Sequence, residues 1–358
     1  MERLHIAFFG PTNSGKSTLV NALAGQQVSL VSPIPGTTTD PVRKVIELPG
    51  LGPCVLIDTA GLGDASALGA ERERLTRAIV DETDIAVILD APDAASTSPE
   101  DFGALAAQAG VPVIRYKRGE SVPSLLERLI AVAPKEEQKF LTGGLVQAES
   151  SVLLVMPQDS EAPKGRLILP QVQVLRELLD RGCVPHCCTP DSLPAALESL
   201  SRRPDLVITD SQVFSLVERT IPKDCPLTSF SVLLAAAKGD VRVFVEGARA
   251  IGSLKPGSRV LIAEACTHVP DTEDIGRVKI PALLRKRVGA VDVEIAAGND
   301  FPEDLSPYSL IIHCGACVAN ARLVRSRIRK ALLAGVPITN YGIALAELGG
   351  ILGRISIP

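Results

Sequence analysis

Two short groups of cysteine and histidine residues are the side chains best suited to chemistry. Cys266 and His268 form the first group; His313, Cys314 and Cys317 form the second, with 44 residues between the two histidines. Three thiolates suit an iron–sulfur cluster, which usually takes four cysteines. With a histidine they can instead close a tetrahedral zinc site. The Cys-Gly-Ala-Cys spacing also fits a thiol redox pair, so three kinds of site remain open.

Each group directly follows an apolar run that predicts a buried parallel strand. The runs are residues 259–263 and 309–312, and both have the length and β-branched content of such strands. If the two strands lie in one sheet, their carboxyl ends share an edge, where open α/β sheets hold their ligands. In that case both groups lie at that edge.

A complete phosphate-binding loop lies near the start of the chain. Residues 4–9 predict a strand, residues 10–17 read G-x-x-x-x-G-K-S, and residues 18–23 predict a helix. Backbone amides and the helix N-terminus suit phosphate oxygens, Lys16 suits the β- and γ-phosphates, and Ser17 suits Mg²⁺. The residues expected to contact the nucleotide are Gly10, Asn13, Ser14, Gly15, Lys16, Ser17 and Thr18.

Two further segments resemble the switch regions of translation-factor-related GTPases. Thr38 follows the pattern of a Mg²⁺ ligand, and Asp58 and Gly61 form a D-x-x-G motif that senses the γ-phosphate. With Lys16 they make up the expected catalytic set. Leu62 cannot orient a water molecule as glutamine does. Asn13 stands where potassium-activated members of this class hold the cation, so the resemblance implies slow hydrolysis that K⁺ accelerates.

The motif that normally reads guanine is incomplete. An N-K-x-D sequence is expected after the strand near residues 111–114, but Tyr116 replaces the asparagine and Gly119 the aspartate, and only Lys117 is in register. The carboxylate that would accept hydrogen bonds from the guanine edge is therefore missing. The sequence supports nucleotide binding more strongly than it supports a preference for GTP over ATP.

The composition excludes several classes of partner. A net charge of −4 gives no reason to expect nucleic acid or an anionic membrane, and aromatic residues make up only 3% of the chain. No apolar run has membrane-spanning length, and the predicted first strand begins without a signal peptide. Eight cysteines without secretory features indicate metal or redox use in a reducing compartment. We expect a cytoplasmic protein.

The alternation of short strands and helices predicts an α/β protein with three domains. A P-loop GTPase domain covers residues 1–135, a polar linker 136–150, a small parallel α/β domain 151–240, and an α/β domain with the cysteine groups 241–358. The helix predicted over residues 319–333 carries several basic residues, which are expected to face solvent. These are Arg322, Arg325, Arg327, Arg329 and Lys330.

The P-loop domain, the middle domain and the C-x-H-x44-H-C-x-x-C pattern together resemble the FeFe-hydrogenase maturation GTPases of the HydF family. The sequence around Cys266 and residues 274–281 strengthen the resemblance. It implies a homodimer that uses GTP, Mg²⁺ and K⁺ and binds a 4Fe-4S cluster through Cys266, Cys314 and Cys317. The middle domain would then be the dimerisation domain. Members carry a two-iron precursor to the hydrogenase and work with two radical-SAM maturases.

Three cysteines leave one iron of such a cluster without a thiolate. Glu273 is the favoured exchangeable ligand because it lies in the loop after Cys266, and an oxygen ligand on thiolate-preferring iron is easily displaced. His268 and His313 are the alternative ligands, or tune the cluster through hydrogen bonds.

Two other classes remain open from the residues alone. One is a zinc-containing regulatory GTPase of RNA modification or ribosome assembly. The other is a nucleotide-coupled thiol oxidoreductase, which needs only Cys314 and Cys317. Iron, sulfide and zinc content distinguishes all three classes.

Overall fold

The computed structural model describes residues 3–11, 13–25, 41–59, 69–89, 99–134, 140–158, 165–265 and 274–358, with the backbone alone at 69–73 and 99–101. The chain forms two compact units, residues 1–137 and 138–358. Among the predicted site residues, Thr38, Gly61, Cys266, His268 and Glu273 lie outside the described residues. No helix among the described residues is long and apolar enough to cross a membrane.

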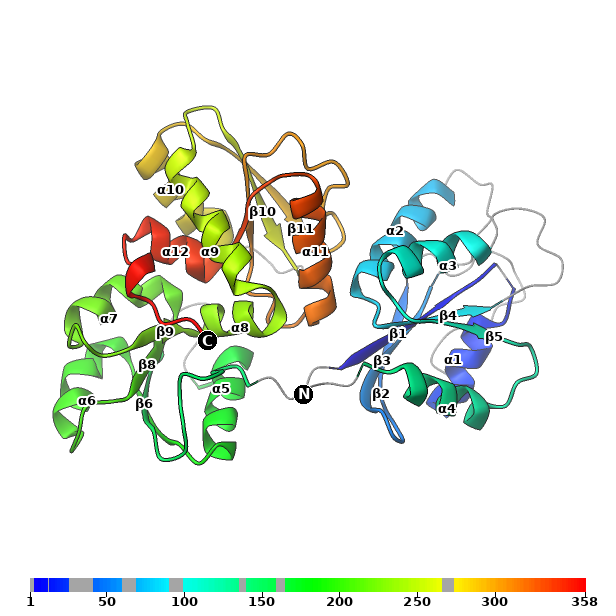
Figure 1. Ribbon diagram of the computed structural model, residues 1–358, viewed down its shortest axis with the longest axis horizontal. Helices are drawn as coiled ribbons and strands as arrows, with labels where there is room; N and C mark the ends of the chain where they lie inside the picture. Colours follow the sequence, from blue (N-terminus) through cyan, green and yellow to red (C-terminus); the bar gives the residue numbers. More distant parts are fainter. Residues whose placement is uncertain are drawn as a thin grey trace. The chain divides into compact units, whose positions relative to one another are not determined.

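The first unit is a five-stranded sheet covered by helices on both faces (Figure 1). Its strands, in the order β2-β3-β1-β4-β5, are parallel except for β2. The strands are β1 (Leu4–Phe9), β2 (Val42–Leu48), β3 (Gly52–Asp58), β4 (Ile85–Leu89) and β5 (Val113–Tyr116). The helices are α1 (Lys16–Ala24), α2 (Gly69–Glu82), α3 (Pro99–Gln108) and α4 (Val122–Val132).

Apolar side chains on both faces of the central strands explain this layering. One core packs α1 and α4 against one face of the sheet, and a second packs α2 and α3 against the other. The carboxyl ends of β1 and β3 lie side by side, since Phe8 is paired with Asp58. The phosphate loop and the D-x-x-G aspartate are therefore brought to one edge, as in other doubly wound sheets.

The second unit contains two further four-stranded sheets, both wholly parallel. The middle sheet has the order β7-β6-β8-β9 and the last sheet β11-β10-β12-β13. The middle strands are β6 (Ser151–Val155), β7 (Val184–Cys188), β8 (Leu206–Thr209) and β9 (Leu227–Ser229). The last four are β10 (Arg259–Glu264), β11 (Asp292–Ala297), β12 (Leu310–His313) and β13 (Ile338–Asn340).

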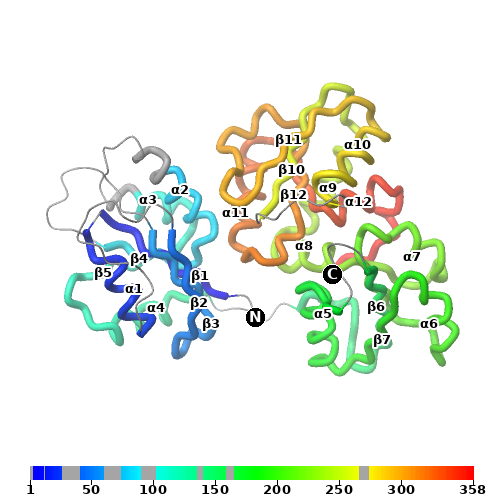
Figure 2. The backbone as a smooth tube through the Cα atoms, turned by 180° about the vertical axis from the view of Figure 1, so that it is seen from behind, coloured from blue at the N-terminus to red at the C-terminus, as the bar shows by residue number. Residues whose placement is uncertain are grey.

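Helices cover both of these sheets (Figure 2). They are α5 (Leu169–Asp180), α6 (Leu193–Ser199), α7 (Phe214–Thr220), α8 (Phe230–Lys238), α9 (Val241–Arg249), α10 (Ile280–Val288), α11 (Ala321–Leu333) and α12 (Tyr341–Leu348). Short 3₁₀ turns occur at Pro190–Ser192, Ser211–Val213, Ala250–Ser253 and Leu352–Arg354, and a π-helical turn at Ile275–Lys279.

The two sheets of the second unit share one apolar core. Phe214 of α7, Phe244 of α9 and Ile328 of α11 belong to the same buried cluster, although they come from the two different halves of the unit. The last residues of the chain return to the middle sheet, where Ile355 bridges Leu227 of β9. The halves are therefore fixed to each other by a continuous core.

The expected α/β fold with parallel sheets is confirmed. The strands predicted before the two cysteine groups are β10 and β12, which are parallel neighbours with Ile262 opposite Ile312. Both groups therefore follow the carboxyl edge of one sheet.

Candidate nucleotide site and candidate metal centre

The phosphate loop connects β1 to the N-terminus of α1 and is tightly built. Gly10 has no room for a side chain, because an added Cβ would lie 2.6 Å from the backbone oxygen of Leu89. Asn13 and Gly15 both adopt positive φ angles, 64° and 96°. Their backbone turns the chain so that α1 begins at Lys16 with its amides facing the loop.

Lys16 lies over this loop with only 6% of its surface exposed. Its ammonium donates hydrogen bonds of 2.9 Å to the carbonyl oxygens of Gly10 and Pro11. Burial lowers the pKa of Lys16 to about 8, while the negative charge of Asp58 opposes the shift. A buried ammonium of this kind gains a strong partner when a polyphosphate enters the loop.

Asp58 supplies the observation that fits a bound Mg²⁺ ion. It is 1% exposed, and neither of its carboxylate oxygens has a hydrogen-bond partner among the described residues. A buried, unsatisfied carboxylate is costly unless a cation or donor meets it. Hard oxygen ligands are those that Mg²⁺ prefers, so the carboxylate of Asp58 and the hydroxyl of Ser17 are suitable ligands for the metal of a bound nucleotide.

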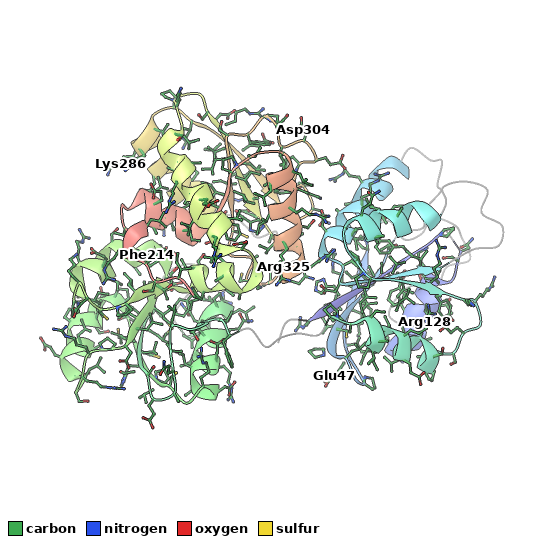
Figure 3. The ribbon with its side chains drawn as sticks, viewed as in Figure 1. Glu47, Arg128, Phe214, Lys286, Asp304 and Arg325 are labelled. Atoms are coloured by element: carbon green, nitrogen blue, oxygen red, sulfur yellow. The ribbon has the colours of Figure 1, made fainter. Side chains whose placement is uncertain are left out.

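The loop that normally recognises the base, residues 116–120, is held by hydrogen bonds within itself and to α4. Tyr116 donates a 2.9 Å hydrogen bond to the carbonyl oxygen of Glu120. The carboxylate of Glu120 accepts from Arg128 of α4 at 3.0 and 3.1 Å and from Ser124 at 3.0 Å. Figure 3 shows Arg128 on the helix that follows this loop. The nearest carboxylate to the missing aspartate at Gly119 is therefore already engaged.

This geometry predicts weak discrimination between GTP and ATP. A site that hydrogen-bonds a polar group rejects an analogue lacking it by ~10⁴-fold or more, and without a free carboxylate most of that factor is lost. We expect competition binding to give a ratio of dissociation constants far below this value. Gly119→Asp restores the carboxylate of the motif, and we expect this variant to bind GTP in preference to ATP. A strong GTP preference in the unaltered protein would contradict the prediction.

The second cysteine group occupies the loop between β12 and α11. The sulfur of Cys314 accepts hydrogen bonds from the backbone amides of Ala265 at 3.1 Å and Ala316 at 3.4 Å. Backbone donors aimed at sulfur favour the thiolate, which is the form that binds metals. The first contact places Ala265, the described residue that immediately precedes Cys266 in the sequence, beside Cys314.

The donor set therefore fits a soft metal. Cys314 and Cys317 both lie in this loop and are partly exposed. No cluster of three or more metal-binding side chains occurs among the described residues, which do not include Cys266, His268 or Glu273.

His313 is held by hydrogen bonds at both ring nitrogens. Its Nδ1 lies 2.8 Å from the carbonyl oxygen of Cys314 and must donate to it, so Nε2 accepts from the guanidinium of Arg327 at 3.2 Å. Burial, and next the charge of Arg327, lower the pKa of His313 to about 3. The ring is therefore neutral. With both nitrogens engaged, the geometry favours a role in positioning Cys314 over direct metal ligation.

The expectation that every basic residue of α11 faces solvent is wrong for Arg327. This side chain is 2% exposed and also donates to the carbonyl oxygens of Glu264 at 3.1 Å and Gly298 at 2.6 Å. Arg325 and Arg329 are exposed as expected, and Figure 3 marks Arg325 on this helix. Arg327 lies three residues after Val324 and four before Ala331, on the buried stripe of the helix. That spacing is the feature of the sequence that indicates the burial of Arg327.

A second set of buried groups joins the end of β10 to the π-helical turn. Glu264, 1% exposed, accepts from Arg277 at 2.8 Å, and Asp274 accepts from the backbone amide of Arg277 at 2.7 Å. Gly276 has no space for a side chain, since an added Cβ would lie 1.9 Å from the hydroxyl of Tyr341. The end of β10 and the start of this turn are thus tied together on the third sheet.

The fold and these two sites define a P-loop GTPase domain joined to two parallel α/β domains. A 50S ribosome-binding GTPase family model matches residues 5–115. The hydrogen maturase F dimerization domain matches residues 141–239, and the hydrogen maturase F tetramerization domain matches residues 242–357. These last two models cover more than half of the chain between them. The chain belongs to the hydrogen maturase F family, which confirms the resemblance seen in the sequence.

Curated relatives match the first domain. The tRNA modification GTPase MnmE of Methylobacterium sp. (strain 4-46) is 38% identical over 151 residues, 37% of this chain and 34% of that protein. MnmE of Nitrosospira multiformis is 42% identical over 106 residues, 29% of this chain and 23% of that protein. The chain thus spans about a third or less of the length of these relatives.

Two of the similar solved structures have low sequence identity to the chain. A variant of Aquifex aeolicus Era bound to GDP.AlF4⁻ is 17% identical, with a TM-score of 0.29 over 83% of this chain and 94% of that one. Arabidopsis thaliana Toc33 with GDP and Mg²⁺ is 20% identical, with a TM-score of 0.25 over 37% and 60% of the two chains. Scores of this size do not by themselves establish a common fold.

Proposed function

We propose that this protein is a GTPase and iron–sulfur scaffold for maturation of the FeFe-hydrogenase active site. The single observation that carries the proposal is the hydrogen bond from the amide of Ala265, the residue before Cys266, to the sulfur of Cys314 at the edge of one sheet. Family membership supports the same assignment. The hydrogenase and two radical-SAM maturases are the proposed partners, and a two-iron precursor is the proposed cargo.

The proposed cluster site uses Cys266, Cys314 and Cys317, with Glu273 as the exchangeable ligand. A bound 4Fe-4S cluster would supply an iron with a displaceable ligand, to which an incoming precursor can attach. The chain's own residues hold the cysteines: His313 and Arg327 fix the end of β12, and the two amides at Cys314 favour its thiolate. GTP with Mg²⁺ at Asp58 and Ser17, and K⁺ at Asn13, complete the proposed cofactors.

Anaerobic reconstitution tests this function. We expect the wild-type protein to retain about four irons and four sulfides per chain and no stoichiometric zinc. Cys314→Ala and Cys317→Ala should each lose the iron, because two thiolates cannot hold the cluster. Cys187→Ala is the matched control, since Cys187 is an exposed cysteine on β7 of the middle sheet. Stoichiometric zinc without iron would instead favour a zinc-containing regulatory GTPase.

Oligomerisation is supported by the two family domains, and we propose a homodimer through the middle sheet. The β9 edge is occupied by Ile355 of the same chain, whereas β7 lies at the opposite edge. Exposed apolar side chains gather on β7 and the adjoining α5. They are Leu169, Val172, Leu179 and Val184, each 44–53% exposed. An apolar sheet edge of this kind suits a second copy of the chain.

A further inference from the structure

Lys238 is a buried lysine at the end of α8 whose ammonium faces the cysteine loop. Only 6% of the residue is exposed. Its Nζ donates to the carbonyl oxygens of Ala316 at 2.7 Å, Cys317 at 3.3 Å and Ala319 at 2.7 Å. Lys238 lies in the region matched by the dimerization-domain model, and the loop in the region matched by the tetramerization-domain model. One side chain therefore links the two halves of the second unit at the candidate metal centre.

Backbone groups in and beside the loop point at two side chains, Cys314 and Lys238. The amides of Ala265 and Ala316 point at the sulfur of Cys314, whereas three carbonyl oxygens point at Lys238. Ala316 adopts a φ of 50°, a left-handed conformation that is unfavourable for a non-glycine residue. The ammonium offsets this cost because hydrogen bonds from a charged donor are the strong ones. The arrangement also places a positive charge beside the cysteine ligands.

Contacts at both ends of helix α8 fix the position of Lys238. Its first turn is capped by Ser229, which accepts from the amide of Val232 at 3.2 Å. Gly239, directly after Lys238, has no room for a side chain, since an added Cβ would lie 2.8 Å from the ring of Phe244 and 3.0 Å from Ile328. Figures 1 and 2 show α8 where the two halves of the unit meet. The helix cannot shift without displacing this packing.

The first turn of α8 also contacts the other end of the loop. Ser231 donates to the side-chain oxygen of Asn340 at 3.1 Å, and Asn340 donates to the carbonyl oxygen of Cys314 at 3.5 Å. Helix α8 therefore lies along the whole loop, with Ser231 near Cys314 and Lys238 near Cys317.

We propose that Lys238 is a positioning residue through which the middle domain sets the conformation of the Cys314–Cys317 loop. This inference rests on the proposed metal site, whereas the contacts of Lys238 with the loop are made between the chain's own atoms. The chain's own α8 thus prepares the cysteines for a soft metal cluster. The buried ammonium would also raise the reduction potential of a cluster bound there, because a nearby positive charge favours the more negative, reduced state.

Lys238→Met tests the proposal because it keeps the apolar stem and removes the ammonium. In the metal-free protein, alkylation of Cys314 and Cys317 by iodoacetamide should rise about tenfold, as should amide exchange at residues 315–320. Buried Cys183 and Cys225 serve as internal references. Lys223→Met is the matched control, since Lys223 pairs with Glu218 on the surface of the same domain. In reconstituted protein, the reduction potential should fall in Lys238→Met and not in the control.

Lys238→Gln, which keeps a donor without the charge, is the second variant in case the methionine variant does not fold. Labelling and exchange changed by less than about twofold in a folded variant would overturn the proposal. So would a uniform rise in exchange across residues 138–358, or unfolding of both variants, since Lys238 would then be a general stability residue. If the wild-type protein binds no cluster, the proposed function fails, while the metal-free labelling still decides the role of Lys238.

Discussion

Lys16→Ala is expected to lower nucleotide hydrolysis by at least about 10²–10³-fold, the effect of removing one preorganised electrostatic partner from a transition state. The ammonium is hydrogen-bonded to the phosphate loop, in the position from which the lysine of such loops stabilises the charge on the transferred phosphoryl group. Asp58→Ala should have a similar effect, because it removes the buried carboxylate that fits Mg²⁺. Steady-state hydrolysis of GTP with Mg²⁺ in a potassium buffer measures both.

Loss of activity in Lys16→Ala is not expected to arise from unfolding. Burial lowers the pKa of Lys16 to about 8, so the charged form is disfavoured in the folded protein and its removal relieves that cost. Lys44→Ala, on β2 of the same unit, is the control that should keep wild-type rates. The iron content after reconstitution should be unchanged in every variant, because the cysteines belong to the other unit. Loss of iron in a folded Lys16 variant would show that the two sites are not independent.

Gly247→Ala is expected to destabilise the second unit by about 3 kcal/mol or more, at or beyond the upper end of the usual cost of overpacking. Helix α9 packs so closely on β13 that an added Cβ would lie 2.0 Å from the carbonyl oxygen of Ile338 and 2.5 Å from its carbonyl carbon. Both are backbone atoms, so the helix itself must move. The contact also holds Thr339, which donates to the carbonyl oxygen of Phe244 at 2.8 Å.

Thermal unfolding of the two variants Gly247→Ala and Gly252→Ala tests this contact. An added Cβ at Gly252 meets nothing within 4 Å, so that variant should keep the wild-type midpoint. Equal midpoints for the two would contradict the close packing of α9. A lowered midpoint in Gly247→Ala should be accompanied by faster labelling of Cys314, because Asn340 of β13 contacts its carbonyl oxygen.

The sequence predicted the parts of the fold that periodicity and motifs specify. The apolar runs before the two cysteine groups are β10 and β12. The sequence left open whether these strands share a sheet, and the structure shows that they are parallel neighbours. The sequence did not predict helix α12, which follows a short strand in a glycine-rich segment. Its residues are mostly apolar, and a short apolar run does not distinguish a buried helix from a buried strand. Helix α8 was missed for the same reason, since it is apolar on nearly every side.

The charged groups around the cysteine loop differ in how well the sequence predicts their burial. Arg327 lies on the apolar stripe of α11, so its burial was visible in the helical spacing. Lys238 is separated from Ala316 by 78 positions, and a lysine in the last turn of a helix ordinarily interacts with that helix's own carbonyl groups. Only the packing of one domain on the other determines that it meets the loop instead. The unpartnered carboxylate of Asp58 likewise depends on the tertiary surroundings of β3.

The return of the chain's last residues to β9 limits how large an assembly the middle sheet can build. Ser356 donates to the carbonyl oxygen of Leu227 at 2.6 Å, so one border of this sheet is capped by its own chain. A sheet with two free edges can pair with further copies indefinitely and form a filament. A sheet with a single free edge can pair with only one further copy. Two copies joined through β7 about a twofold axis therefore leave no border of the combined sheet available for growth.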